Sequence, residues 1–358
     1  MAAGGSGTDP EAALSGQSSQ TNRNEFPSTQ EQAVFFIKFV TFPRRGCLTD
    51  SAPMTGIPTI MTQFGLIRVA AAMPRVHLAD PAANAREILD MCRENNLKLT
   101  DYIYRMEENS VKEYLKKVWE AMKETLIRGL YAEGILPGGL GVERKAKILF
   151  SKRCYNESAD ITMNRLIAAY AYAVSEENAD EHIVVTAPTC GSCGVLPSVM
   201  YYMCNDRGFP EEEILDALAV AALIGNVIRT NASISGAECG CQAEIGSACS
   251  MTAGALASLY GLNIDQIEYA AEIAMEHNLG LTCDPVKGLV QIPCIERNAV
   301  AAMRAISSVN LSRFLYKTRK ISFDEVVATM YKTGKDMDEK YRETSHGGLA
   351  RIYNEFSS

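Results

Sequence analysis

Residues 217–228 read ALAVAALIGNVI and form the most apolar run of a 358-residue chain. Hydrophobic side chains occur around the whole circumference of a helix drawn through this run, rather than on one face. That pattern predicts a helix buried on all sides. The run is too short and too rich in alanine to span a bilayer. It therefore predicts an interior helix of a globular domain.

Helical patterns continue on both sides of this run. Ser110 and Glu113 have the spacing of a capping box, and apolar residues at helical spacing follow as far as Leu130. Asn263 precedes another helical segment that ends before Gly280. About ten such segments after Pro81, without a convincing sheet, predict an all-α fold. The expected helices are residues 83–95, 97–106, 110–130, 161–174, 195–204, 214–229, 249–260, 264–277, 298–317 and 323–331, with short extended pieces at 34–42 and 182–186.

Composition divides the chain into three regions. Residues 1–32 are rich in Gly, Ser, Thr and Gln and lack periodicity, which predicts a disordered tail. Residues 33–80 form a short irregular segment, and residues 81–358 form the all-α domain.

A formal net charge of −8 and the lack of a Lys/Arg-rich run argue against nucleic acid or a membrane as a partner. The N-terminus lacks the basic and apolar parts of a secretory signal, so we expect a cytoplasmic protein.

Eleven cysteines are unusual in such a chain, and they indicate metal binding or catalysis rather than disulfides. Cys190 and Cys193 form a C-x-x-C pair, whose spacing also suits a redox dithiol or half of a zinc site. Five cysteines lie alone or in apolar helical runs and are interpreted as small buried hydrophobic residues: Cys47, Cys92, Cys154, Cys204 and Cys249.

Cys241, Cys283 and Cys294 differ from the others because they lie where the helical pattern breaks, in GCQ, LTCDP and IPCIE. Cys241 is close to the start of a predicted helix, and a helix N-terminus favours the thiolate form of cysteine. Three thiolates without a fourth would bind a [4Fe–4S] cluster and leave one iron open. That iron is a Lewis acid, which can polarise a hydroxyl group and help it to leave.

Other polar residues crowd the same part of the chain. His277, in MEHNLG, is interpreted either as a histidine that caps a helix or as a residue lining a site near Cys283. Glu272 and Glu276 have the spacing of a solvated helix face. No lysine has a setting typical of a pyridoxal phosphate Schiff base, so we expect no such cofactor. Further charged residues are expected to hold loops or to pair with a substrate charge: Glu238, Glu244, Asp284, Glu296 and Arg297.

Long motifs from about residue 83 to the C-terminus resemble the α (catalytic) region of iron–sulfur-dependent bacterial L-serine dehydratases. The matching stretches, in the same order as in that family, are RGLYAEGILPGGL, SEENADEHIVVTAPTCGSCGVLP, NASISGAECGCQAEIGSACSM, AAEIAMEHNLGLTCDPVKGLVQIPCIERNA and TGKDMDEKYRETSHGGLA. The resemblance implies an all-α catalytic domain that holds a [4Fe–4S] cluster through Cys241, Cys283 and Cys294.

The implied reaction is the β-elimination of water from L-serine. The open iron would take the substrate carboxylate and β-hydroxyl while a base removes the α-proton, and hydrolysis of the product gives pyruvate and ammonia. Such an enzyme would degrade serine and feed gluconeogenesis. His277 is the candidate base because it lies near Cys283 in the sequence. The candidate substrate-binding residues are Cys190, Ser233, Ser235, Glu238, Arg297 and Asn298.

Two departures from the family pattern bear on activity. This chain has Cys190 where family members often carry asparagine. Family enzymes also have a β region, fused or separate, that completes the active site, and residues 33–80 resemble at most a remnant of it. We therefore expect a separate β chain or a homodimer, or else impaired activity. Alternative functions are a related cluster lyase acting on threonine or cysteine, and a non-catalytic redox or structural protein that binds a cluster or zinc.

Overall fold

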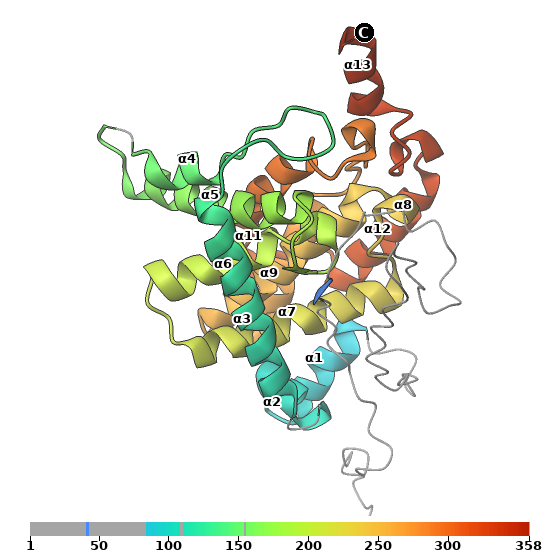
Figure 1. The fold of residues 1–358 in the computed structure, drawn as a ribbon. Coiled ribbons are helices and arrows are strands. Elements are labelled where there is room, and N and C mark those ends of the chain that lie inside the picture. Colours follow the sequence, from blue (N-terminus) through green and yellow to red (C-terminus); the bar gives the residue numbers. More distant parts are fainter. Residues whose placement is uncertain (1–40, 43–83, 108–109, 154, 358) are drawn as a thin grey trace, which may run out of the picture. The chain divides into compact units, whose positions relative to one another are not determined.

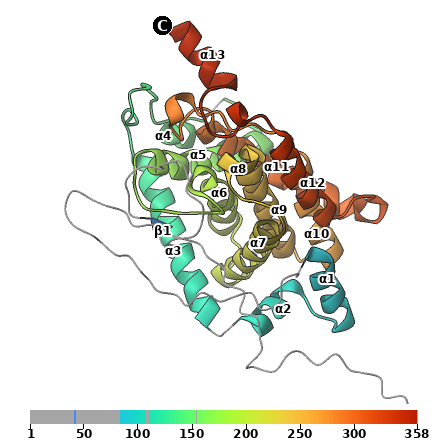
Figure 2. The same cartoon turned by 90° about the vertical axis from the view of Figure 1, so that its right-hand side faces the viewer.

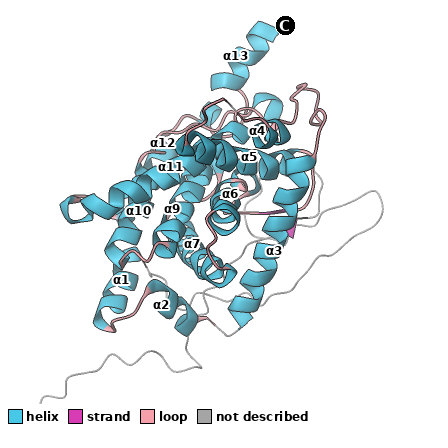
Figure 3. Ribbon diagram, turned by 90° about the vertical axis from the view of Figure 1, so that its left-hand side faces the viewer, coloured by secondary structure: helices cyan, strands magenta, loops and turns pink. Residues whose placement is uncertain are grey.

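The computed structural model describes residues 41–42, 84–107, 110–153 and 155–357, and these residues are mostly helical (Figures 1 and 3). The predicted all-α fold is confirmed. The predicted tail, and residues 33–80 apart from Thr41–Phe42, lie outside the described part of the chain. The helices are α1 (Ala85–Glu94), α2 (Leu99–Met106), α3 (Ser110–Tyr131), α4 (Ala146–Ser151), α5 (Ala159–Ala179), α6 (Val195–Tyr201), α7 (Glu211–Asn231), α8 (Gly236–Cys239), α9 (Ser247–Leu259), α10 (Ile264–Glu276), α11 (Cys294–Leu315), α12 (Phe323–Asp336) and α13 (Gly348–Ser357).

The core is built around α9, which packs against α6, α7, α10 and α11 (Figure 2). Its sequence, SACSMTAGALASL, is buried at every position except Ser258. Small side chains let the neighbouring helices approach closely, and a Cβ atom at Gly254 would overlap Ile224 of α7. Two of its buried hydroxyl groups donate hydrogen bonds to carbonyls, Ser250 to Ala271 of α10 and Thr252 to Ala248, each at 2.7 Å. The apolar run at residues 217–228 lies inside α7 and is buried as predicted, apart from a half-buried Asn226.

The structure also corrects several boundaries. The predicted interior helix at 161–174 is α5, but Ile161 in its first turn is 52% exposed. α11 begins at Cys294 rather than at residue 298, and α12 continues to Asp336. The sequence patterns missed three helices: α4, α8 and α13. Thr41–Phe42, the described part of the piece predicted at 34–42, forms β1, and the piece predicted at 182–186 contains β2 (Val184–Val185). The two strands pair in antiparallel register. None of the described helices is long and apolar enough to cross a membrane.

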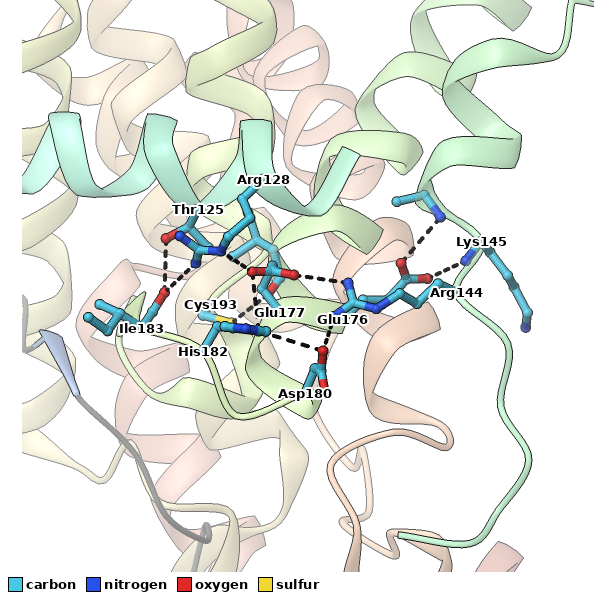
Figure 4. Close-up of polar contacts among 12 residues, drawn as sticks. Thr125, Arg128, Arg144, Lys145, Glu176, Glu177, Asp180, His182, Ile183 and Cys193 are labelled. Carbon is cyan, nitrogen blue, oxygen red and sulfur yellow. Dashed lines mark hydrogen bonds and ion pairs between the residues drawn. The ribbon is translucent and has the colours of Figure 1, made fainter. Parts of the chain in front are cut away.

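A buried ion pair and a backbone hydrogen bond fasten the Gly/Pro-rich loop at 134–145 to α5 (Figure 4). Arg144 donates to Glu177 at 2.9 Å, and the carboxylate of Glu176 accepts from the backbone N–H of Lys145 at 2.6 Å. Burial raises the pKa of Glu176 to about 7. From this anchored loop, the carbonyl of Pro137 accepts a hydrogen bond from the Gln291 amide at 2.6 Å. The network therefore supports the loop that leads into α11.

Gly129 lies where α3 crosses α5, and a Cβ atom there would overlap the backbone carbonyl of Ala173. Because a backbone group cannot rotate away as a side chain can, Gly129→Ala is expected to destabilise the fold by about 2 kcal/mol. Urea unfolding followed by circular dichroism measures the change. Lys117→Ala, on the exposed face of α3, is the control and should differ little from the wild type. Equal midpoints for the two variants would contradict the tight crossing.

Glu272 lies inside the protein rather than on a solvated face, and is 3% exposed. The sequence-based interpretation was wrong for this residue because α10 packs on α9, α11 and α12. Burial, together with the nearby charge of Glu276, raises the pKa of the Glu272 carboxyl from 4.5 to about 8. The folded state therefore holds this proton at a pH where the unfolded chain releases it.

The raised pKa makes stability fall as the pH rises from about 4.5 to about 8. Glu272→Gln cannot titrate, so the variant should gain about 4 kcal/mol relative to the wild type between pH 5 and pH 8.5. Urea unfolding at both values measures this gain, and Glu124→Gln, on the exposed face of α3, is the control. A stability difference between variant and wild type that does not change with pH would show that Glu272 titrates normally.

Candidate metal centre

Cys241, Cys283 and Cys294 come together at one end of α9 and α11. Cys241 precedes a π-helical turn, Gln242–Gly246, that continues into α9, so it lies near a helix start as predicted. Cys294 is the first residue of α11, and Cys283 belongs to the loop before it. All three thiols are buried. The sulfur atoms of Cys241 and Cys283 and a carboxylate oxygen of Glu244 all lie within 4.8 Å of one another.

The three thiols influence one another strongly. A hydrogen bond from Cys283 and the charge of Arg297 lower the pKa of Cys241 to about 7. The same hydrogen bond and burial raise the pKa of Cys283. Burial and the charges of Cys241 and Glu244 raise the pKa of Cys294. Thiolates held so close together repel one another, and a bound cationic iron centre offsets that repulsion. The donor set therefore fits an iron–sulfur cluster bound through thiolates.

Arg297 connects the cysteine loop to α11. Its guanidinium donates to the carbonyl of Thr282 at 2.7 Å, and lies 3.6 Å from the carboxylate of Asp284. It also lies close enough to the Cys241 sulfur to raise its own pKa, although burial acts in the opposite sense. With a side chain only 20% exposed, Arg297 contributes a partly desolvated positive charge beside the thiols.

The segment before α13 holds the same loop from the other side. The backbone N–H of Cys283 donates to the carbonyl of Tyr341 at 2.8 Å, and that of Glu343 donates to the carbonyl of Cys283 at 2.6 Å. Asp284 accepts a hydrogen bond from the backbone of Leu349. Sequence reasoning missed this contact. The Gly-Gly pair at residues 347–348 was the available signal, because a Cβ atom at Gly348 would overlap the Asp284 carboxylate.

Asn298 holds the 189–194 loop against the start of α11. Its side-chain oxygen accepts from the N–H of Gly194 at 2.9 Å, and its amide donates to the carbonyls of Gly191 and Cys294. These backbone contacts, together with 1% exposure, describe a buried loop anchor. Cys190 is half-buried in the same loop, and the Cys193 thiol faces the Val174 carbonyl. Substrate binding by Asn298 and Cys190 stays a prediction.

Ser233, Ser235 and Glu238 lie together just before Cys241. The Ser233 hydroxyl donates to Glu238 at 2.6 Å and accepts from the backbone N–H of Ser235 at 3.1 Å. Lys335 of α12 pairs with Glu238 at 2.6 Å, and this ion pair lowers the pKa of the carboxyl. The contacts fasten α8 to α12, and the predicted role of these three residues in substrate binding is not tested by them.

His277 occupies the C-cap of α10, with a side chain that is 59% exposed. Its Nδ1 atom lies 2.9 Å from the carbonyl of Ile273 in the preceding turn. Of the two interpretations, these contacts match the histidine that caps a helix. Among the described residues, its imidazole makes no hydrogen bond or ion pair with Cys241, Cys283 or Cys294. Its role as the base remains a prediction from sequence proximity.

None of the described cysteines forms a disulfide. The interpretation as small buried residues is confirmed for Cys92 and Cys249, and burial raises their pKa values to about 11 and about 12. Cys204 is half-buried, which agrees less well. Cys47 and Cys154 lie outside the described residues. Cys239 is buried against α12, where a Cβ atom at Gly334 would overlap it.

Comparison with known proteins identifies the family of this chain. Residues 68–350 match the family model described as serine dehydratase alpha chain. The chain belongs to this family. It is 46% identical to the L-serine dehydratase of Streptomyces coelicolor, over 75% of this chain and 61% of that protein. It is also 47% identical to an L-serine dehydratase of Helicobacter pylori, over 91% of this chain and 73% of that protein.

The motifs predicted a resemblance to the α region of L-serine dehydratases, and these matches confirm it. A third relative, the L-serine dehydratase of Haemophilus influenzae, is 45% identical over 77% of this chain and 62% of that protein. The chain therefore spans about three fifths of the length of the Streptomyces and Haemophilus relatives that it matches. The three candidate cysteine ligands all lie inside the matched residues 68–350.

Proposed function

We propose that this chain is the catalytic part of a [4Fe–4S] L-serine ammonia-lyase, which converts L-serine to pyruvate and ammonia. One observation carries the proposal: three cysteines from separate stretches of the chain are buried at one place. The sulfur atoms of Cys241 and Cys283 and a carboxylate oxygen of Glu244 lie within 4.8 Å of one another there. Family membership and the similarity to L-serine dehydratases support the same substrate.

Cys241, Cys283 and Cys294 would hold the cluster. When bound, the cluster supplies an iron that acts as a Lewis acid on a substrate hydroxyl. The three thiols are buried, and Arg297 contributes a positive charge beside them. Arg297 offsets the charge of the Cys241 thiolate and fixes the position of residues 282–284. Asn298 holds the 189–194 loop beside Cys294, so that the loop can form one wall of a substrate site.

The curated relatives extend well beyond the part that this chain matches. We therefore propose that a β region, supplied by a separate chain or by a second copy of this one, completes the substrate site. The enzyme would be cytoplasmic and would degrade serine, and its pyruvate would enter gluconeogenesis. The base that removes the α-proton is His277 in the sequence-based prediction. A partner that covers the exposed end of α10 would bring other groups near this imidazole.

Anaerobic purification tests the proposal. We expect a brown protein with about four irons and four sulfides per chain, which forms pyruvate from L-serine alone or after addition of the β region of a family member. Formation of 2-oxobutyrate from threonine, or of pyruvate and hydrogen sulfide from cysteine, would identify the related lyases. A protein that binds zinc and no sulfide would instead be the structural or redox alternative. A cluster without turnover under either condition would contradict the enzymatic assignment.

A further inference from the structure

Glu244 brings a carboxylate into the cysteine group, and the proposed function assigns it no role. It lies three residues after Cys241, on the π-helical turn that starts α9. One of its carboxylate oxygens lies within 4.8 Å of both the Cys241 and the Cys283 sulfur atoms. Its Oε2 atom is 3.9 Å from the Cys283 sulfur. Two sulfurs and an oxygen therefore surround the same small volume.

The surrounding backbone leaves room for this carboxylate. A Cβ atom at Gly236 would lie 2.6 Å from Oε2, and one at Gly191 would lie 3.3 Å from Oε1. Larger residues at these positions would push the Glu244 side chain away from the cysteines. Gly236 is the first residue of α8, and Gly191 lies in the 3-10 turn before α6. The carboxylate therefore lies where two separate segments of the chain approach each other closely.

A hydroxyl group sets the orientation of the Glu244 side chain. Thr189 donates a hydrogen bond to Oε1 at 2.8 Å, while Oε2 points to the Cys283 sulfur. The negative charge of Glu244 contributes to the raised pKa values of both Cys283 and Cys294. A carboxylate placed here therefore works against thiolate formation as long as no cation is bound. Once iron is bound, the same charge contributes to binding it.

We propose that Glu244 is a fourth protein ligand of the cluster in the resting enzyme, bound through a carboxylate oxygen to the iron that the three cysteines leave open. This inference rests on the proposed function, because it requires a [4Fe–4S] cluster. Carboxylate oxygen is an established ligand type for iron, and it exchanges more readily than thiolate. Glu244 would therefore retain the fourth iron between turnovers and give way to the substrate. Thr189 acts as a positioning residue.

The test compares Glu244→Gln with Glu296→Gln, each reconstituted anaerobically with ⁵⁷Fe and sulfide. Glu296 is the matched control because it is an exposed carboxylate in the first turn of α11, two residues after Cys294. Iron and sulfide content are measured first. The loss of one iron during controlled oxidation is then monitored by electron paramagnetic resonance, which detects the three-iron form as it appears. Mössbauer spectroscopy examines the fourth iron itself.

We expect the wild type and Glu296→Gln to lose the fourth iron at the same rate. Glu244→Gln should lose it about tenfold faster, with altered Mössbauer parameters for that iron alone. Thr189→Val keeps the carboxylate but removes its hydrogen bond, so it should lose iron at an intermediate rate. If Glu244→Gln takes up no cluster, the rate of iron loss from Thr189→Val tests the proposal instead. A rate equal to that of the wild type would then overturn it.

Two further results separate this inference from the proposed function. A wild-type protein without a cluster would refute the proposed function itself. A wild type with a cluster, combined with a Glu244→Gln variant that has an unchanged fourth-iron spectrum and rate of iron loss, would refute only the ligand role of Glu244. None of these measurements depends on turnover, so they can be made before a β region has been found.

Discussion

Replacing Cys283 by serine is expected to abolish the cluster and nearly all pyruvate formation from L-serine. A serine hydroxyl stays protonated at neutral pH and is a poor ligand for iron, whereas cysteine binds as the thiolate. Cys283 also lies at the centre of the group, in contact with both Cys241 and Glu244. Because a Lewis-acid metal contributes several kcal/mol to transition-state stabilisation, activity should fall by about a thousandfold or more.

Iron content, visible absorption and pyruvate formation measure the effect of Cys283→Ser in anaerobic preparations. Cys204→Ser is the matched control, because Cys204 is a half-buried thiol after α6 that belongs to no candidate ligand group. The control should keep its iron and its activity. Equal losses in the two variants would show that the ligand assignment is wrong, as would a Cys283→Ser protein with the absorption of the wild type.

Arg297→Leu should have the second-largest effect, with cluster affinity reduced by about tenfold to a hundredfold. The substitution removes the positive charge beside the Cys241 sulfur and the hydrogen bond to the Thr282 carbonyl. Asp284 loses an ion-pair partner at the same time. The thiols then repel one another without compensation, and the loop that carries Cys283 is less firmly held. Arg297→Lys keeps the charge but not the forked geometry, so its affinity should be intermediate.

The cluster affinity of each variant is measured by adding an iron chelator and recording the loss of visible absorption over time. Arg313→Leu is the control on the same helix, since Arg313 is exposed and stacks on Tyr260 far along α11 from Cys294. It should retain iron as the wild type does. If Arg297→Leu also retained iron normally, the guanidinium would have only a structural role in the loop.

Local sequence patterns predicted the parts of the centre that depend on near neighbours. The breaks in helical pattern at GCQ, LTCDP and IPCIE singled out Cys241, Cys283 and Cys294, because a thiol presented at a loop or helix end is flanked by residues unsuited to a helix interior. The apolar run in α7 predicted its burial for a similar reason: hydrophobic residues on every side of a helix exclude a solvated face. Such signals lie within a few residues of one another.

Other features of the centre depend on contacts between distant parts of the chain. Glu244 meets Thr189 across 55 residues, and Cys283 is held by Tyr341 from the segment before α13. No spacing in the sequence reveals such pairs, because they arise only when α9 and α11 pack together and the loops at their ends meet. For the same reason Glu272 looked solvated but is buried. Periodicity shows which face of a helix is apolar, whereas the partners that cover the other faces are set by packing over the whole domain.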